Sequence, residues 1–261
     1  MRPANLRIAA WQCQPGSLDV AGNLRRLDEA CAAAAARQAE VLVTPEMFTS
    51  GYGITASQVA ELAEDPGGPA EATVAQIARR HGLAVVYGHP ERAAGGHVYN
   101  AATLIGPDGL VRGRHRKVHL YGEVDRSLFE PSPEPPAAFD FDGSRVGMLI
   151  CYDVEFPEAV RHLAVDGARA VLVPTANMTG FEAVQQFVVR SRAYENGCGI
   201  AYANYCGADD VFAYSGLSLI CGPGGEVLAQ ASATDEELLI ADLAGESLET
   251  FLADRRADLY G

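Results

Sequence analysis

The chain has 261 residues, of which 48% are hydrophobic and 21% are charged, and its formal net charge is -14. A chain of this size and composition can bury a sizeable core, which excludes a disordered protein. The negative charge repels nucleic acids and anionic membrane surfaces, so we expect no nucleic acid and no membrane as partners.

The sequence also predicts the cellular compartment. No run approaches the roughly 20 apolar residues that a membrane span needs, and the first dozen residues lack the apolar core of a secretory signal. We therefore expect a cytoplasmic protein whose six cysteines are free thiols. No two of them form a CxxC pair, which argues against a structural zinc site and a thioredoxin-type motif.

Short apolar runs alternate with amphipathic stretches along the chain. In chain order they predict strand 6–12, helix 23–38, strand 41–44, helix 70–80, strand 83–88, hairpin 97–105 and 110–117, strand 146–150, helix 157–165, strand 170–173, helix 181–196, strand 200–204, hairpin 217–221 and 226–229, and strand 237–243. This mixture of alternation and hairpins predicts a layered α/β fold with a mixed sheet. No linker is long enough to divide the chain, so we expect residues 1–261 to form a single domain.

Three polar side chains stand where predicted strands end. Glu46 follows the strand over 41–44 and Pro45, which has no N–H to offer the sheet. Lys117 ends the second strand of a hairpin, and Cys151 follows the strand over 146–150. Loops converge and ligands bind at strand ends in layered α/β proteins. We therefore expect an acid, a cation and a thiol in one pocket.

These three residue types are sufficient for nucleophilic catalysis. A thiol with a pKa of about 8.5 needs a base or a nearby cation to become a thiolate. A partly desolvated glutamate can accept its proton, and an ammonium can stabilise the oxyanion that forms on the attacked carbonyl. Taken singly, each residue has a plainer interpretation, because a lone Glu after a strand is usually a capping group and a lone Cys usually packs in the core.

The segments around these residues resemble the nitrilase-like carbon–nitrogen hydrolase superfamily. The resemblance rests on Val43-Thr44-Pro45-Glu46, on His115-Arg116-Lys117-Val118-His119-Leu120, and on Leu149-Ile150-Cys151-Tyr152-Asp153-Val154-Glu155-Phe156-Pro157-Glu158. Shorter similar segments lie at 173–177, 192–196 and 254–260. Three separate motifs in the family's order make the resemblance specific, and it covers essentially the whole chain.

The resemblance implies a four-layer αββα sandwich that assembles as an αββα–αββα dimer, and so a homodimer or a higher homo-oligomer. It also implies a Glu–Lys–Cys triad, carried here by Glu46, Lys117 and Cys151. This triad needs no metal and no organic cofactor, so we expect none.

The family often has a second active-site glutamate shortly after the lysine, and we assign this role to Glu123. Family members commonly place the residue one or two positions later, where this chain has Val124 and Asp125. Glu130 is a weaker candidate.

Three further residues are candidates for the substrate site. The backbone N–H of Tyr152 can point at the oxyanion beside Lys117. Asn177 stands at the end of a predicted strand and is expected to line the pocket, and Tyr52 lies in a Gly-flanked loop where surface packing is an equal interpretation.

Other residues near these motifs have structural interpretations. Asp153 and Glu155 are expected to orient loop backbone or to pair with an arginine such as Arg192. Four apolar residues follow helical spacing and are interpreted as core or subunit contacts: Phe181, Val184, Phe187 and Val188.

The implied reaction is hydrolysis of a small carboxylic amide to the acid and ammonia through a thioester acyl-enzyme. Carbamoylases commonly carry Asn after the nucleophile, and nitrilases often carry Trp-Glu, whereas this chain has Tyr152-Asp153. The amidase branch is therefore favoured. Hydrolysis of a nitrile or an N-carbamoyl amide by the same triad is the alternative.

The sequence also offers three rival interpretations of function. His115 and His119 face the same way on a strand and could begin a metal site, but no third ligand has a supporting spacing. A Cys–His dyad at Cys151 is a second rival. A non-catalytic binding protein with the same fold is the third, and loss of a triad residue would favour it, yet all three are present.

Overall fold

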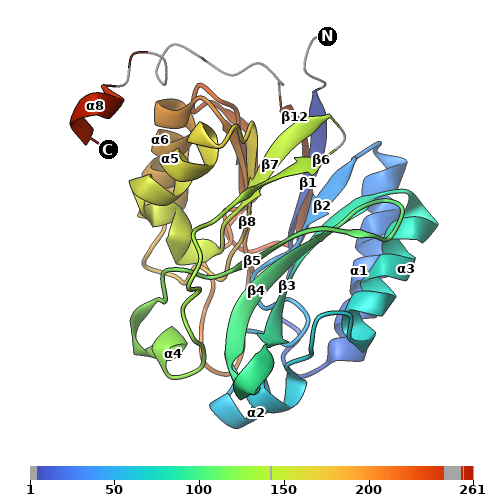
Figure 1. The fold of residues 1–261 in the computed structure, drawn as a ribbon. Coiled ribbons are helices and arrows are strands. Elements are labelled where there is room, and N and C mark those ends of the chain that lie inside the picture. Colours follow the sequence, from blue (N-terminus) through green and yellow to red (C-terminus); the bar gives the residue numbers. More distant parts are fainter. Residues whose placement is uncertain (1–4, 142, 244–253, 255, 261) are drawn as a thin grey trace.

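The structure is a computed structural model that describes residues 5–141, 143–243, 254 and 256–260 (Figure 1). Its strands form two six-stranded sheets in which parallel and antiparallel neighbours are mixed. The first sheet has the order β12-β1-β2-β3-β4-β5, with bounds Glu237–Leu243, Leu6–Gln12, Val41–Val43, Ala84–Arg92, Val98–Ile105 and Val111–Arg116. The second has the order β11-β10-β9-β8-β7-β6, with bounds Val227–Gln230, Leu219–Cys221, Gly199–Ala203, Ala170–Pro174, Ser144–Met148 and Ala138–Phe141.

The two sheets pack face to face through a shared apolar core. In β1, Ile8 and Ala10 enter this core, whereas Ala9 and Trp11 point to the opposite side of the sheet. Side chains alternate between the two faces of a strand, and both faces of this strand are buried. The apolar run over 6–12 is therefore continuous because β1 is covered on both sides.

Helices cover the outer face of each sheet (Figure 1). Helices α1 (Val20–Ala36) and α3 (Pro69–His81) pack on the first sheet, and α5 (Pro157–Val165) and α6 (Val189–Asn196) pack on the second. The order of layers is helix, sheet, sheet, helix, as the resemblance implies. None of the helices in the described part of the chain is both long and apolar enough to cross a bilayer.

Most predicted elements are confirmed within a few residues. Helix α3 ends at Gly82 with φ 59°, and α6 ends at Gly197 with φ 60°, a left-handed conformation that glycine adopts at little cost. The predicted helix over 181–196 differs, because it begins with a π-helical turn, η3 (Val184–Val188).

Several short elements were not predicted, because too few residues carry a periodic signal. They are α2 (Ala56–Leu62), η1 (Ala94–Gly96), α4 (Gly122–Arg126), β6, η2 (Cys151–Glu155) and α8 (Ala257–Tyr260). Two of them, α4 and η2, carry residues of the candidate site.

Candidate active site

Glu46 lies in the turn that follows β2, and its side chain is fully buried. Its backbone N–H donates to the carbonyl oxygen of Thr175, which follows β8 in the other sheet, at 3.2 Å. Gly88 on β3 gives this turn room, since a Cβ at that position would lie 2.7 Å from the carbonyl oxygen of Pro45. The turn therefore sits where the two sheets meet.

Lys117 follows β5 and places its ammonium between two carboxylates. Its Nζ lies 2.6 Å from Glu46 Oε1 and 2.6 Å from Asp125 Oδ2, and all three side chains are 0% exposed. Burial opposes the positive charge, but the carboxylates of Glu46 and Asp125 raise the pKa of Lys117 well above its ordinary value. The ammonium is therefore charged at neutral pH.

The two carboxylate oxygens of Glu46 have different surroundings. Oε1 accepts hydrogen bonds from Asn100 Nδ2 at 2.7 Å and from Lys117. Oε2 is buried, and no described residue donates a hydrogen bond to it. Burial raises the pKa of Glu46 although Lys117 opposes the shift, so this carboxylate is a stronger base than an exposed one. Oε2 is thus the oxygen available to accept a proton.

Cys151 opens η2 directly after Ile150, with φ 47°. A residue with a side chain rarely adopts this left-handed conformation, which costs about 1–3 kcal/mol and is often found at active sites. Burial, together with the Glu46 carboxylate, raises the pKa of the Cys151 thiol, and Lys117 opposes the shift. The resting cysteine is therefore a neutral thiol that needs a base when it attacks.

Asp153 connects the turn that carries Cys151 to the segment that carries Lys117. Its carboxylate lies 2.9 Å from His115 Nε2 and 2.9 Å from His119 Nδ1, and it accepts hydrogen bonds from the N–H groups of Val118, His119 and Ile150. These hydrogen bonds confirm that Asp153 orients loop backbone. They also explain why two histidines face the same way, since both contact one buried carboxylate.

The second carboxylate that reaches Lys117 is Asp125, and Glu123 lies outside the site. Glu123 is exposed, because two residues along a helix point about 200° apart and α4 turns the Asp125 side chain inward. Asp125 also accepts from Tyr52 Oη at 2.8 Å and from the N–H of Tyr121 at 2.8 Å. Glu130 is exposed as well, with His97 Nδ1 at 3.6 Å from its carboxylate.

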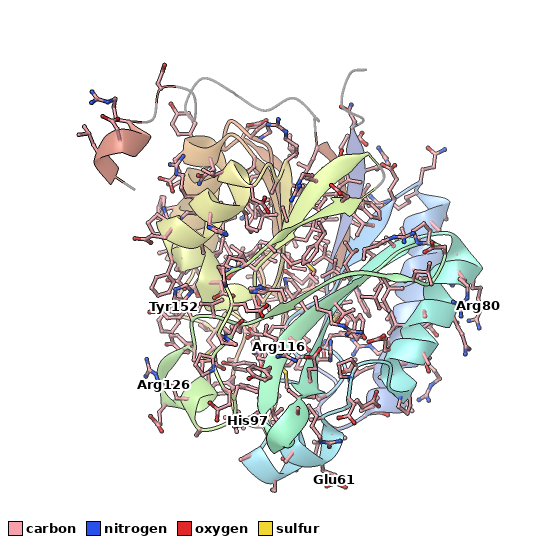
Figure 2. The ribbon with its side chains drawn as sticks, in the orientation of Figure 1. Glu61, Arg80, His97, Arg116, Arg126 and Tyr152 are labelled. Carbon is pink, nitrogen blue, oxygen red and sulfur yellow. The ribbon has the colours of Figure 1, made fainter. Side chains whose placement is uncertain are left out.

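A narrow cleft reaches Cys151, and Tyr52, Tyr152 and Asn177 all line it. The cleft holds about 310 Å³ of space between atoms, including the part open to solvent, which is at the lower end of the range of about 300–1,000 Å³ for small-molecule sites. Figure 2 shows Tyr152 between α4, which carries Arg126, and the α5 side of the molecule. The cleft thus opens where α4, η2 and the segment after β8 meet.

The sequence does not assign Asn100 or Asp125 to the site, although Asn100 binds Glu46 and Asp125 binds Lys117. Asn100 stands in the middle of a predicted hairpin strand, where nothing in the local pattern separates it from a structural amide. Asp125 follows Lys117 closely, as a second acid should, and only the unpredicted helix α4 decides between it and Glu123.

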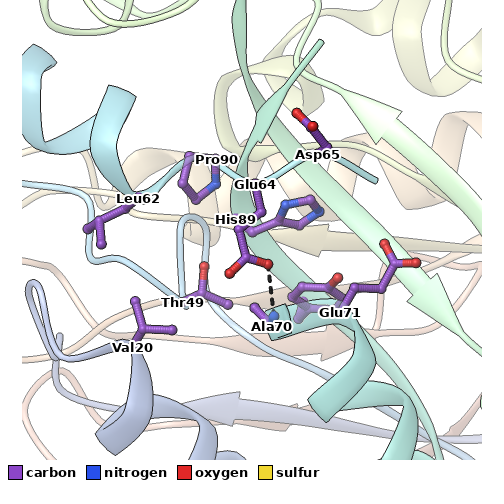
Figure 3. Close-up of a pocket in the computed structure, with 10 residues that line it drawn as sticks. Val20, Thr49, Leu62, Glu64, Asp65, Ala70, Glu71, His89 and Pro90 are labelled. Atoms are coloured by element: carbon purple, nitrogen blue, oxygen red, sulfur yellow. Dashed lines mark hydrogen bonds between the residues drawn. The ribbon is translucent and has the colours of Figure 1, made fainter. Parts of the chain in front are cut away.

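Another hollow lies away from Cys151, around Glu64, Asp65, Glu71 and His89 (Figure 3). Glu64 Oε2 accepts a hydrogen bond from the N–H of Ala70 at 2.8 Å. Burial lowers the pKa of His89 to about 4, so its imidazole is neutral at pH 7. No cysteine lines this hollow. Across the described ranges, no three His, Cys, Asp or Glu side chains are grouped closely enough to hold a metal ion.

Comparison with known proteins identifies the family. The model of the carbon-nitrogen hydrolase family matches residues 7–251, and the chain belongs to this family. It is 46% identical to "Hydrolase in pqqF 5'region" of Pseudomonas protegens over 98% of this chain and 90% of that protein. It is also 32% identical to a nitrilase of Pyrococcus abyssi over 98% of this chain and 99% of that one.

Among solved structures, the fold matches an amidase from Nesterenkonia sp. with a TM-score of 0.86 and 35% identity, over 100% of this chain and 97% of that one. That amidase has been solved in complex with butyramide and with acrylamide added to its active-site cysteine. The similarity covers the whole arrangement of sheets and helices described above.

Proposed function

We propose that this protein is a cysteine amidase that hydrolyses a small carboxylic amide to the acid and ammonia. The observation that carries the proposal is the buried arrangement of Glu46 and Lys117 beside Cys151, in which Glu46 Oε2 has no hydrogen-bond donor in the described chain. The small volume of the cleft favours a small acyl group. The amidase from Nesterenkonia binds butyramide, which is such a compound.

In the first half of the proposed reaction, Glu46 Oε2 takes the thiol proton and the sulfur of Cys151 attacks the amide carbon. Lys117 Nζ and the N–H of Tyr152 stabilise the oxyanion of the tetrahedral intermediate. The carbon–nitrogen bond then breaks, and Glu46 returns the proton to the leaving nitrogen. Ammonia departs, and a thioester joins the acyl group to Cys151.

In the second half, water attacks the thioester carbon and gives a proton to Glu46. The carbon–sulfur bond breaks, the carboxylic acid is released, and the proton returns to the sulfur of Cys151. Throughout both halves Asp125 holds Lys117 and Tyr52 in place. Every proton transfer uses residues of this chain, so this route calls for no cofactor.

Hydrolysis of a nitrile or an N-carbamoyl amide by the same triad is the alternative, and the relative from Pyrococcus abyssi carries the name nitrilase. Release of ammonia from matched amides, nitriles and carbamoyl compounds distinguishes these activities. We expect butyramide to be the better substrate and butyronitrile the poorer one. Turnover of the nitrile alone would overturn the amidase proposal.

We also propose that the protein assembles as a homodimer. Large apolar side chains are exposed around the helices of the second sheet, among them Val165 at 60% and Phe187 at 65%. Large apolar side chains exposed to water favour contact with another protein surface. The family resemblance supports a second copy of this chain as the partner.

A further inference from the structure

The cleft beside Cys151 presents negative and aromatic groups to a substrate. None of the described residues that line it is an arginine, lysine or histidine. Lys117 is not among the lining residues, and its ammonium is held by the carboxylates of Glu46 and Asp125. An acyl group that carried its own carboxylate would therefore find no free cation in the cleft.

Glu155 is the charged residue in the lining of this cleft, and no described residue donates a hydrogen bond to its half-buried carboxylate. The neighbouring Arg192 forms no ion pair with it, since its Nη2 donates to the backbone carbonyl of Glu155 at 2.7 Å and its Nη1 lies 3.0 Å from Glu195 Oε1. Burial raises the pKa of Glu155, while Lys117 and Arg192 oppose the shift. A cation beside this carboxylate would stabilise its charged form.

Aromatic rings surround the same space. The ring of Tyr121 lies 5.4 Å from that of Tyr152 and 5.9 Å from that of Phe181, each in an edge-to-face arrangement. All three residues line the cleft with Glu155. The faces of aromatic rings attract ammonium groups, and the attraction is stronger where water is excluded.

Asn177 adds a hydrogen-bond acceptor to the lining of the cleft. Its Nδ2 donates to the carbonyl oxygen of Phe181 at 3.0 Å and to Gln185 Oε1 at 2.9 Å, so both amide hydrogens are used. Its Oδ1 remains as the polar atom that a ligand can bind, and it can only accept. Glu155 and Asn177 in the lining of the cleft therefore favour a ligand that donates hydrogen bonds.

We infer that Glu155 selects amides whose acyl group carries a protonated amine. The ammonium would lie between the Glu155 carboxylate and the aromatic rings while the amide carbon faces Cys151. This inference rests on the proposed amidase activity and specifies its substrate class. It assigns to Glu155 the discrimination between substrates, with no part in the bond-breaking steps.

Three amides test the inference because they differ mainly in charge: 3-aminopropanamide is cationic, butyramide is neutral with the same chain length, and succinamate is anionic. We expect wild-type kcat/KM for ammonia release to be highest for 3-aminopropanamide and lowest for succinamate. In Glu155→Gln, the ratio of the cationic to the neutral kcat/KM should fall at least about tenfold, as for a charge removed from a partly buried ion pair.

Glu158→Gln is the matched control, since Glu158 is exposed and lies outside the cleft lining; its ratio should stay at the wild-type value. If wild-type enzyme hydrolyses butyramide at least as well as 3-aminopropanamide, or if Glu155→Gln leaves the ratio unchanged, the inference is wrong and the amidase proposal stands. If wild type releases ammonia from none of the three amides, both are overturned. The wild-type ranking decides the matter even if a variant fails to fold.

Discussion

At the scale of single residues, the site is a buried arrangement of charges around one thiol. Lys117 is held by the carboxylates of Glu46 and Asp125, which compensate the cost of burying its charge. The same arrangement leaves Glu46 Oε2 without a hydrogen-bond donor in the described chain. A buried oxygen without a donor destabilises the fold, so such an atom points to a functional role. The sequence predicts Glu46, Lys117 and Cys151 as the acid, the cation and the nucleophile because each follows a strand end within a family motif.

The first prediction concerns the nucleophile. Cys151→Ala should abolish ammonia release and leave the fold intact, because the variant loses the attacking sulfur but keeps a small side chain in the same turn. Circular dichroism checks the fold, and an ammonia assay with butyramide checks turnover. Activity near the wild-type level in a folded variant would contradict the assignment.

The second prediction separates the two acids after Lys117. Asp125→Asn should lower kcat at least about tenfold, because the loss of one carboxylate shifts the ammonium that stabilises the oxyanion, and small displacements of catalytic groups are costly. Glu123→Gln, which changes an exposed residue of the same helix, should retain wild-type kcat and KM.

The comparison is made by steady-state kinetics on both variants at one pH, and Asp125→Glu tests whether a carboxylate alone restores activity. Wild-type kcat in Asp125→Asn together with a lowered kcat in Glu123→Gln would assign the role to Glu123. The sequence could not settle this choice, since it depends on which face of the short helix α4 turns inward.

At the scale of elements, the long strands and helices were predictable and the short ones were not. Strands such as β8 and β9 are continuous apolar runs, and α3 and α6 end at glycines, so the local pattern determines them. Elements of about five residues, such as α4 and η2, are shaped by contacts with distant segments. The π-helical turn η3 likewise leaves no periodic signature, although it carries Gln185, which binds Asn177.

The third prediction concerns the connection that Asp153 makes between β5 and η2. Asp153→Asn should lower the free energy of unfolding by roughly 2–4 kcal/mol, because a buried acceptor of several hydrogen bonds loses its charge. Urea unfolding at neutral pH measures the loss. Asp210→Asn, at an exposed position, should change stability by less than about 0.5 kcal/mol.

The same residue predicts a pH dependence. Burial would raise the pKa of Asp153, but hydrogen bonds from His115 and His119 outweigh it and lower the pKa below the ordinary value of 3.8. A lowered pKa in the folded state means that the stabilisation is complete above pH 3.8 and is lost as the pH falls towards the folded-state value. Wild type should therefore lose more stability than Asp153→Asn as the pH is lowered below about 4. An equal loss of stability in wild type and in Asp153→Asn as the pH falls would contradict the predicted lowering of the Asp153 pKa.

At the scale of the whole molecule, two sheets with helices on their outer faces bring segments from across the chain to one cleft. The turn after β2 and the end of β5 come from the first sheet, and η2 and the segment after β8 come from the second. Alternation of strands and helices predicted layers, yet only the family resemblance specified two sheets packed together. A local pattern cannot show which strands share a sheet, because the pairing of β12 with β1 joins opposite ends of the chain.

The last prediction concerns assembly at this scale. Phe187 lies in η3 on the outer side of the second sheet and is 65% exposed, an unfavourable position for a large apolar ring in a monomer. If this face contacts a second copy, Phe187→Asp places a charge in an apolar interface and should convert a dimer into a monomer.

Light scattering coupled to size-exclusion chromatography measures the mass of each form. Leu110→Asp is the matched control, since Leu110 is 58% exposed but lies in the turn between β4 and β5 of the first sheet, so this variant should stay dimeric. A monomeric wild type would refute the proposed dimer. A dimer that persists in Phe187→Asp would place the contact on another face, because a buried unpaired carboxylate is too costly for an interface to absorb.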